Sequence, residues 1–312
     1  MSPLRTRAYA GRADLDGLIA FASRTLAARW PAYSYWHPGD VAWMLYPTAD
    51  QPNPAIRLWL DGDSVAGVAW FYAPLFVRID ACPEAGDALL DEMLDWAERY
   101  RVESAGEGEA KLTLSTLSFE SDRERIAVLE KRGYRKITRG DVMMRRSLET
   151  PIAESVLPDG MRIRDCVDVD LEERAAAHRD AWSHLAHLGM PDVESGFTLD
   201  RYRALREAPL YRPDLYLVVE TGDGRYAACL IGWADEPSGV GLIEPVGTRD
   251  AYRRQGLARA LNLEVLHRQR ALGLRHAQIG TTNFNDRAEA TYLSCGFEIV
   301  ERDRYWLKQV AG

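Results

Sequence analysis

The chain has 312 residues and a formal net charge of −8, with 46% hydrophobic and 28% charged residues. This composition is ordinary for a protein with packed cores, and the length favours two domains. The acidic balance excludes nucleic-acid binding as the main role, because no broad basic surface is available for phosphates. No apolar run approaches the ~20 residues of a membrane span, and residues 1–17 lack the apolar stretch of a signal peptide. We therefore expect a cytoplasmic protein with no membrane partner.

The four cysteines, Cys82, Cys166, Cys229 and Cys295, are scattered along the chain. They form no C-x-x-C motif, so neither a zinc site nor a disulfide framework is indicated. This pattern predicts a reduced, cytoplasmic protein without a bound metal.

An aromatic-rich segment, RWPAYSYWHPGDVAWMLYP, spans residues 29–47. Such clusters usually build a core or an interface between domains, which is the interpretation that we favour. The alternative is that this segment forms a wall of a substrate pocket.

The rest of the N-terminal half predicts a hairpin, a helix, a strand and a second helix. The hairpin spans 55–72 and turns at Gly62, and a glycine turn between apolar runs is typical of this motif. The other elements are a helix at 85–100, a strand at 111–117 and a helix at 121–134.

Residues 145–165 hold Pro151, Pro158 and Gly160 with little periodicity, which indicates a linker followed by a fresh strand. We therefore expect a first domain at 1–150, a linker at 151–160 and a second domain at 161–312.

The C-terminal half predicts the same order of elements. Its strands are expected at 161–165, 214–220, 226–235, 240–246, 276–281 and 304–310, and its helices at 169–182, 254–273 and 285–296. The helix at 254–273 carries Leu257, Leu261, Val265 and Leu272 on one face and stops at Gly273.

The two halves also share local spacing. Asn285, Ala288, Tyr292 and Gly296 step by three, four and four residues, as do Asp122, Arg125, Leu129 and Gly133. The repeated order and spacing predict an internal duplication of a domain of roughly 150 residues.

An arginine-rich turn precedes the helix at 254–273, within EPVGTRDAYRRQGLARALNLEVL (244–266). The first N–H groups of a helix have no internal acceptors, and the helix dipole is positive there. Gly256 would let a phosphate approach these amides closely. The alternative is a helix start that merely faces water, since neither a Walker loop nor G-x-G-x-x-G is present.

A second motif follows at a suitable distance: NFNDRAEATYLSCGF (283–297) reads as N-x-x-A-x-x-x-Y-x-x-x-G-F. With the RRQGLA turn, the C-terminal half resembles the GNAT superfamily of acyl-CoA-dependent N-acetyltransferases over residues 160–310. The N-terminal half resembles a degenerate copy, as in tandem members of this superfamily. The resemblance implies an α+β (α/β) fold of two tandem domains, each a mixed, mostly antiparallel sheet flanked by helices. It also implies that acetyl-CoA lies where two strands splay apart.

The resemblance assigns roles to individual residues. Residues expected to bind the coenzyme pyrophosphate are Arg253, Arg254, Gln255, Gly256, Leu257, Ala258 and Arg259. Residues expected to bind its pantetheine arm or acetyl carbonyl are Val246, Gly247, Thr248 and Asn285.

The N-terminal copy departs from this pattern at PEAGDA (83–88), where Pro83 replaces an arginine. Glu84 and Asp87 would repel a pyrophosphate, and Leu129 replaces Tyr292 and cannot donate a proton. We expect one coenzyme site per chain.

Glu244 and Tyr292 are the expected catalytic residues. An amine attacks a thioester only when neutral, and deprotonating a lysine-like amine at pH 7 takes on the order of 4–5 kcal/mol. A base such as Glu244 and an acid such as Tyr292, near the sulfur, would assist. Glu244 could instead be a structural carboxylate that binds Arg249 or a backbone amide, and Tyr292 could instead pack on Phe297.

His178, His184 and His187 lack metal-ligand spacing, so we expect a solvated helix face there and no metal site. The alternative is that they form part of the substrate pocket. The predicted function is transfer of acetyl from acetyl-CoA to a primary amine of a small molecule or peptide by direct attack. The alternatives are acetylation of a cysteinyl sugar conjugate, as by a mycothiol synthase, and a non-catalytic module that senses acyl-CoA.

Overall fold

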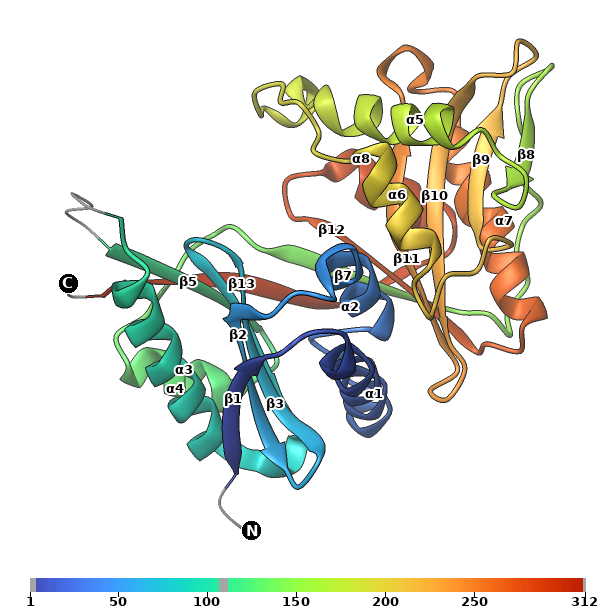
Figure 1. Cartoon of the computed structure of the whole chain (residues 1–312). Coiled ribbons are helices and arrows are strands. Elements are labelled where there is room, and N and C mark those ends of the chain that lie inside the picture. The colour runs from blue at the N-terminus through green and yellow to red at the C-terminus, as the bar shows by residue number, and fades with distance from the viewer. Residues whose placement is uncertain (1–3, 107–111, 311–312) are drawn as a thin grey trace. The chain divides into compact units, whose positions relative to one another are not determined.

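The computed structural model describes residues 4–106 and 112–310, and the chain divides into two compact units (Figure 1). Unit 1 comprises Met1–Val41, Thr48–Val142 and Glu301–Gly312, and unit 2 comprises Ala42–Pro47 and Met143–Val300. The expected strand at 111–117 begins outside the described ranges.

Unit 1 is a mixed sheet with helices on both faces (Figure 1). Its strands, in hydrogen-bonded order, are β1 (Arg5–Tyr9), β2 (Asn53–Asp61), β3 (Ser64–Ala73), β4 (Phe76–Ala81), β5 (Leu112–Phe119) and β13 (Glu298–Val310), and the short β6 (Arg135–Lys136) pairs with β13. Its helices are α1 (Arg12–Arg29), α3 (Gly86–Glu103) and α4 (Arg123–Lys131), while α2 (Pro38–Leu45) crosses the boundary of the units. The hairpin of β2 and β3 confirms the prediction, and Gly62 in its turn has φ +58°.

Unit 2 is built in the same way. Its strands, in hydrogen-bonded order, are β7 (Asp141–Ser147), β12 (His276–Thr282), β11 (Val240–Thr248), β10 (Tyr226–Asp235), β9 (Tyr216–Glu220) and β8 (Arg162–Asp165). Its helices are α5 (Leu171–Ser183), α6 (Leu199–Arg206), α7 (Leu257–Ala271) and α8 (Asp286–Ser294). Helices α5 and α7 lie on opposite faces of this sheet (Figure 1).

The predicted face of α7 is largely confirmed, since Leu257, Leu261 and Val265 are buried. The helix begins three residues later than expected, at Leu257. Arg254 and Gly256 have φ of +64° and +79°, and this left-handed backbone is incompatible with an α-helix. The preceding residues therefore form a turn.

The internal duplication is visible in the hydrogen bonds of α4 and α8. Asp122 caps α4 by accepting the N–H of Arg125 at 3.0 Å, and Asn285 caps α8 by accepting that of Ala288 at 3.2 Å. Gly133 and Gly296, which follow these helices, both have φ +82°. The same local structure therefore occurs at equivalent positions of the two halves.

The compact units do not end at the boundary that the sequence indicated near 150–160. Residues 301–310 of β13 lie in unit 1, where Asp303–Val310 pair antiparallel with Leu112–Phe119, and residues 143–147 of β7 lie in unit 2. The pattern of a strand specifies its buried face but not its neighbour, so the sequence did not show this exchange.

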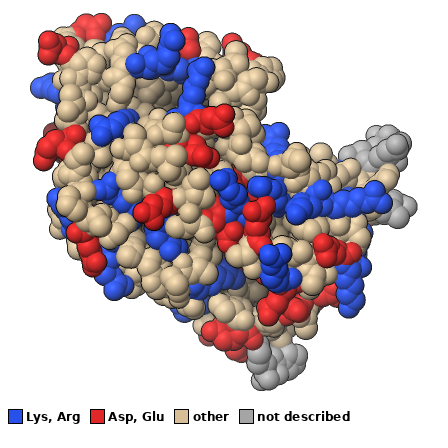
Figure 2. Space-filling view, turned by 180° about the vertical axis from the view of Figure 1, so that it is seen from behind, with Lys and Arg blue, Asp and Glu red and all other residues tan. Residues whose placement is uncertain are grey.

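Acidic and basic side chains are intermixed on the face drawn in Figure 2. Within residues 4–106 and 112–310, no helix is long and apolar enough to cross a bilayer.

A buried pair of carboxyl groups lies where β13 enters unit 1. Asp303 is 1% exposed, and its Oδ1 accepts the backbone N–H of Asp141 at 2.7 Å. Its Oδ2 has no hydrogen-bond partner in the described part of the chain, while the Tyr305 hydroxyl donates to the carboxylate of Asp141 at 3.3 Å. Burial and the neighbouring Asp141 raise the pKa of Asp303 to about 7.

We predict that Asp303→Asn removes the pH dependence that Asp303 gives to the free energy of unfolding. The pKa in the folded state lies above the unfolded value of about 3.9, so the protonated carboxyl stabilises the fold at low pH. This contribution is fully present below about pH 4 and is lost as the pH rises through about 7. Asparagine stays neutral, so the variant should gain stability relative to the natural chain between pH 5 and pH 8.

Denaturant unfolding at both pH values measures this difference. Asp63→Asn, at a fully exposed position of the same unit, is the control and should show no such change. An identical stability difference at pH 5 and pH 8 for Asp303→Asn would contradict the assignment.

Candidate active site

Two parallel strands of unit 2 separate along their length. Strands β11 and β12 pair only at Val240–Leu242 with His276–Gln278. Beyond that point β11 continues to Thr248 and β12 to Thr282. The other edge of β11 pairs with β10 as far as Thr248, so the edge at 246–248 that faces β12 has no strand beside it.

The turn between β11 and α7 presents a row of backbone N–H groups. A short 3₁₀ turn, Asp250–Tyr252, is followed by residues 253–256 and then by α7. In the described structure, the N–H groups of residues 254–259 have no hydrogen-bond acceptor. The left-handed conformations of Arg254 and Gly256 are of the kind that turns successive amides into an anion-binding concavity.

The surroundings of this turn suit a phosphate. A Cβ placed on Gly256 would meet nothing within 4 Å, so the space in front of its backbone is open. The turn also lies at the positive end of the α7 dipole. No carboxylate of the described chain caps these amides, so they remain open to an anionic ligand.

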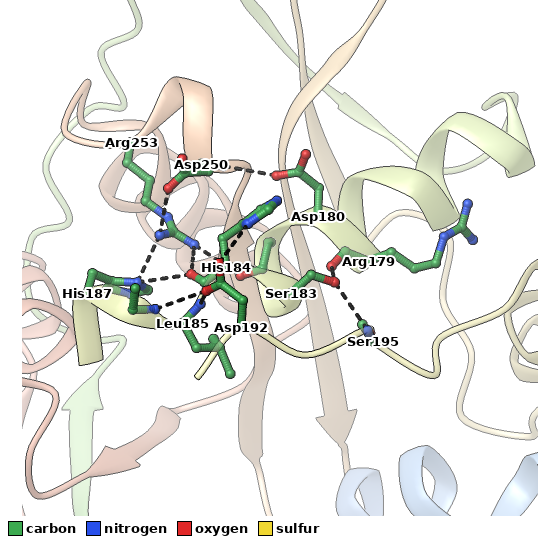
Figure 3. Close-up of polar contacts among 12 residues, drawn as sticks. Arg179, Asp180, Ser183, His184, Leu185, His187, Asp192, Ser195, Asp250 and Arg253 are labelled. Atoms are coloured by element: carbon green, nitrogen blue, oxygen red, sulfur yellow. Dashed lines mark hydrogen bonds and ion pairs between the residues drawn. The ribbon is translucent and has the colours of Figure 1, made fainter. Parts of the chain in front are cut away.

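The side chain of Arg253 has a different role from the one expected. Its guanidinium donates to the carbonyl oxygens of Ala181 at 3.3 Å and His184 at 2.9 Å, at the end of α5 (Figure 3). It also contacts Asp250 at 3.0 Å and Nδ1 of His187 at 2.8 Å. Arg253 therefore fixes the turn against α5, and its guanidinium is engaged in these hydrogen bonds to the protein.

Helix α8 positions Asn285 and Tyr292. The Oδ1 of Asn285 caps the helix, so its Nδ2 is the group left to donate to a ligand. Tyr292 is buried, and its ring packs edge-on against Phe297 at 6.4 Å between centroids. Burial, together with the charge of Glu244, raises the pKa of Tyr292 well above its usual value. The two expected catalytic residues thus influence each other electrostatically.

Arg249, which could have paired with Glu244, pairs with another carboxylate. Its guanidinium pairs with Glu173 of α5 at 2.9 Å. Glu244 is exposed on β11, and its backbone carbonyl accepts the indole N–H of Trp233 at 2.8 Å.

Helix α5 covers the end of β11 next to the splayed edge. A Cβ on Gly247 would overlap the indole of Trp182, with Cη2 only 2.5 Å away, and would lie 2.9 Å from Cβ of Ala181. His178, one turn earlier, is 5% exposed. The expectation of a solvated histidine face was therefore wrong for His178, because this side of α5 packs on the sheet.

Within residues 4–106 and 112–310, no cluster of three histidine, cysteine or acidic residues could hold a metal ion. His184 lies 3.7 Å from Asp192, and both side chains are exposed.

Unit 1 lacks the amide-bearing turn. Its 3₁₀ turn, Pro83–Ala85, runs directly into α3 at Gly86, whereas residues 253–256 intervene in unit 2. No loop remains there to present amides to a ligand.

The gap between β4 and β5 of unit 1 is filled by protein side chains. These strands pair only at Phe76 and Ser115. The ring of Tyr35 stacks on Phe119 at 4.1 Å, and the Arg125 guanidinium lies 4.2 Å from the centre of the Tyr35 ring. Arg125 also donates to the carbonyl of Ile79 on β4 at 2.9 Å. Arg125 stands where the repeat has Ala288, so a bulky cation occupies the place of a small residue.

Known proteins that resemble this chain are acetyltransferases. Residues 182–297 match the acetyltransferase (GNAT) family. This matched segment lies within unit 2.

Two curated relatives carry the name mycothiol acetyltransferase. The one from Saccharomonospora viridis is 26% identical over 275 residues, which is 80% of this chain and 83% of the relative. The one from Thermobispora bispora is 28% identical over 167 residues, covering 49% of this chain and 52% of the relative.

Solved structures confirm the tandem fold. A GCN5-related N-acetyltransferase from Sphaerobacter thermophilus has a TM-score of 0.65 at 20% identity, covering 100% of this chain and 97% of its own. A tandem GNAT protein from the clavulanic acid biosynthesis pathway has a TM-score of 0.63 at 14% identity, covering 99% of both chains. At these identities the likeness concerns the fold alone.

Gly247→Ala should destabilise unit 2, because the added methyl overlaps Trp182 and Ala181. Overpacking of this kind typically costs about 1–3 kcal/mol. Adding Trp182→Ala should restore part of the loss, which thermal unfolding of the two single variants and the double variant would show. Additive effects of the two changes would contradict this contact.

Proposed function

We propose that unit 2 transfers the acetyl group of acetyl-CoA to the primary amine of a small-molecule or peptide acceptor, at one site per chain. The observation that carries this proposal is the row of unbonded N–H groups at residues 254–259, next to the splayed edge of β11. Residues 254–256 are exposed, so a ligand can reach these amides, and an anionic diphosphate supplies several acceptors at once.

The residues present fit acetyl-CoA as a co-substrate. The amides of 254–259 would bind the pyrophosphate. The unpaired edge of β11 at Val246, Gly247 and Thr248 would hydrogen-bond the pantetheine arm as an added strand would. The Nδ2 of Asn285 would donate to the same arm.

Glu244 is proposed as the base that readies the amine. It is exposed on β11, two residues before the unpaired edge. The carboxylate would accept a proton from the ammonium group, directly or through water, because only the neutral amine carries a lone pair for attack. A bound ammonium close to Glu244 then becomes a nucleophile aimed at the thioester carbon.

Tyr292 is proposed as the proton donor to the departing thiolate. Its raised pKa keeps the phenol protonated throughout the physiological range. Full proton transfer from such a phenol to a thiolate is uphill, since a free thiol has a pKa of about 8.5. A hydrogen bond to the developing negative charge nevertheless stabilises the transition state.

Direct attack is favoured over an acyl-enzyme. Cys295, the cysteine nearest Tyr292 in sequence, is buried, and its thiol contacts the carbonyl of Arg259 at 3.8 Å. Burial raises the pKa of this thiol, so it stays protonated and is a poor nucleophile.

A second candidate follows from the curated relatives. The S. viridis relative is named a mycothiol acetyltransferase, which makes a cysteinyl sugar conjugate an alternative acceptor. An acyl-CoA sensor without turnover is a third candidate, but a sensor needs neither Glu244 nor Tyr292. A panel of amines that includes a cysteinyl amino sugar, assayed by release of free thiol, separates these candidates.

Gly256→Val should weaken acetyl-CoA binding at least tenfold. A β-branched residue at φ +79° would distort the turn and set a side chain in front of the amides. Gly86→Val in unit 1 is the matched control, because Gly86 has φ +68° and also stands in open space before a helix. Titration calorimetry with acetyl-CoA measures both, and equal affinities for Gly256→Val and Gly86→Val would refute the proposed site.

Tyr292→Phe should lower kcat by one to two orders of magnitude with little change in acetyl-CoA affinity, because only the hydroxyl is lost. Tyr252→Phe, just before the turn, is the control. Steady-state assays of thiol release measure the effect, and an unchanged kcat for Tyr292→Phe would remove Tyr292 as the acid.

A further inference from the structure

Four aromatic side chains of unit 2, Trp43, His178, Trp182 and Phe197, form a continuous stack that we call the aromatic wall. His178 stacks on Trp182 at 4.2 Å and lies 4.0 Å from Phe197 between ring centroids. Trp43 lies 5.6 Å from Phe197 and 5.7 Å from His178. The side chain of His178 is buried, whereas Trp43 and Trp182 are partly exposed, so the wall has an accessible face.

The aromatic wall adjoins the proposed reacting end of the site. Its member Trp182 covers Gly247, which belongs to the unpaired edge of β11. An acceptor whose amine reaches a thioester at this edge would therefore lie beside Trp182. Aromatic surfaces of this kind contribute binding area at low entropic cost.

Three guanidinium groups surround the aromatic wall and none of them forms an ion pair. Arg174, Arg179 and Arg201 all act electrostatically on His178. Arg201 lies over the face of Trp43 at 5.4 Å, and Arg179 donates to the carbonyl of Phe197 at 3.3 Å. No carboxylate of the described chain pairs with any of the three, although the chain as a whole carries a net charge of −8.

Arg174 makes this excess of positive charge most evident. It is fully buried, and its Nε, Nη1 and Nη2 have no hydrogen-bond partner within the described residues. Its guanidinium lies 5.2 Å from the centre of the Tyr202 ring. A buried, unpaired cation is strongly unfavourable, so an anionic group close by would stabilise this region.

The histidine in the stack does not compensate for these charges. Burial and the nearby arginines lower the pKa of His178 well below its usual value, so the ring is neutral at physiological pH. The buried Nδ1 of His178 makes no hydrogen bond within the part of the chain that the structure describes. The neutral ring can offer this nitrogen to a ligand, but it has no negative charge that would pair with a cationic group.

We propose that the acceptor is an amine that also carries an anionic group, and that the aromatic wall and the arginines Arg174, Arg179 and Arg201 select it. This inference rests on the proposed function for the position of the amine. The local field of three unpaired cations favours a carboxylate or phosphate and disfavours a polyamine.

Matched pairs of amines that differ by one carboxylate test this proposal. Suitable pairs are tryptophan with tryptamine, tyrosine with tyramine, and 6-aminohexanoate with hexylamine. Calorimetry in the presence of CoA gives the affinities, and thiol release from acetyl-CoA gives kcat/KM. We expect at least one carboxylate-bearing partner to bind tenfold or more tightly than its match.

Two arginines of α6 provide the variant and its control. Arg201→Gln should reduce the preference for the carboxylate-bearing amine of a pair at least fivefold. If Arg201→Gln fails to fold, Arg179→Gln should show the same reduction. Arg203→Gln should leave the preference unchanged, because Arg203 is exposed and paired with Asp200 at 3.1 Å. Acetyl-CoA affinity should be unaffected in all three.

The outcomes distinguish a failure of the anionic-acceptor proposal from a failure of the proposed acetyl transfer. Equal binding within every pair, tighter binding of the amines that lack a carboxylate, or no binding of any probe would overturn the anionic acceptor. Tighter binding of carboxylates without any thiol release would support the anion-selective wall while refuting the acetyltransferase reaction at this site.

Discussion

The site depends on backbone N–H groups that the fold leaves without acceptors. A helix always begins with unpaired amides, and here a left-handed turn at Arg254 and Gly256 adds more of them. Strand β11 adds an edge that parts from β12 after Leu242. These two features adjoin because β11 leads straight into the turn. Among the side chains, Arg253 ties the turn to α5, and the charge of Glu244 helps to raise the pKa of Tyr292.

The two halves share an architecture but differ at the start of one helix. Both halves have a capped helix of the α8 type that is followed by a left-handed glycine. Unit 1 has no turn between its 3₁₀ segment and α3, and Tyr35 and Arg125 fill the gap between β4 and β5. The carbonyl of Ile79 on β4 accepts a hydrogen bond from the Arg125 guanidinium, so a side chain satisfies the strand group beside this gap.

Local features were predictable from the sequence because their causes are local. The hairpin of β2 and β3 and the limits of β10 each follow from residue types within a few positions. The helix expected from residue 254 begins only at Leu257, because Arg254 and Gly256 adopt a left-handed turn. Features that depend on distant partners were not predictable. The burial of His178, the commitment of the Arg253 side chain and the placement of Trp43 in unit 2 arise from elements far apart in sequence. The density of aromatic residues at 29–47 was the one signal for Trp43, and it did not say which sheet they would pack on.

Each half of the chain contributes its last strand to the sheet of the other unit, which limits how the chain can be divided. A fragment ending near residue 150 would lack residues 301–310, which line the β5 edge of its sheet, and would retain β7, which belongs to the other sheet. The complementary fragment, 151–312, would lack residues 143–147 of the unit 2 sheet. Cutting the chain at its midpoint would thus remove one strand from each sheet.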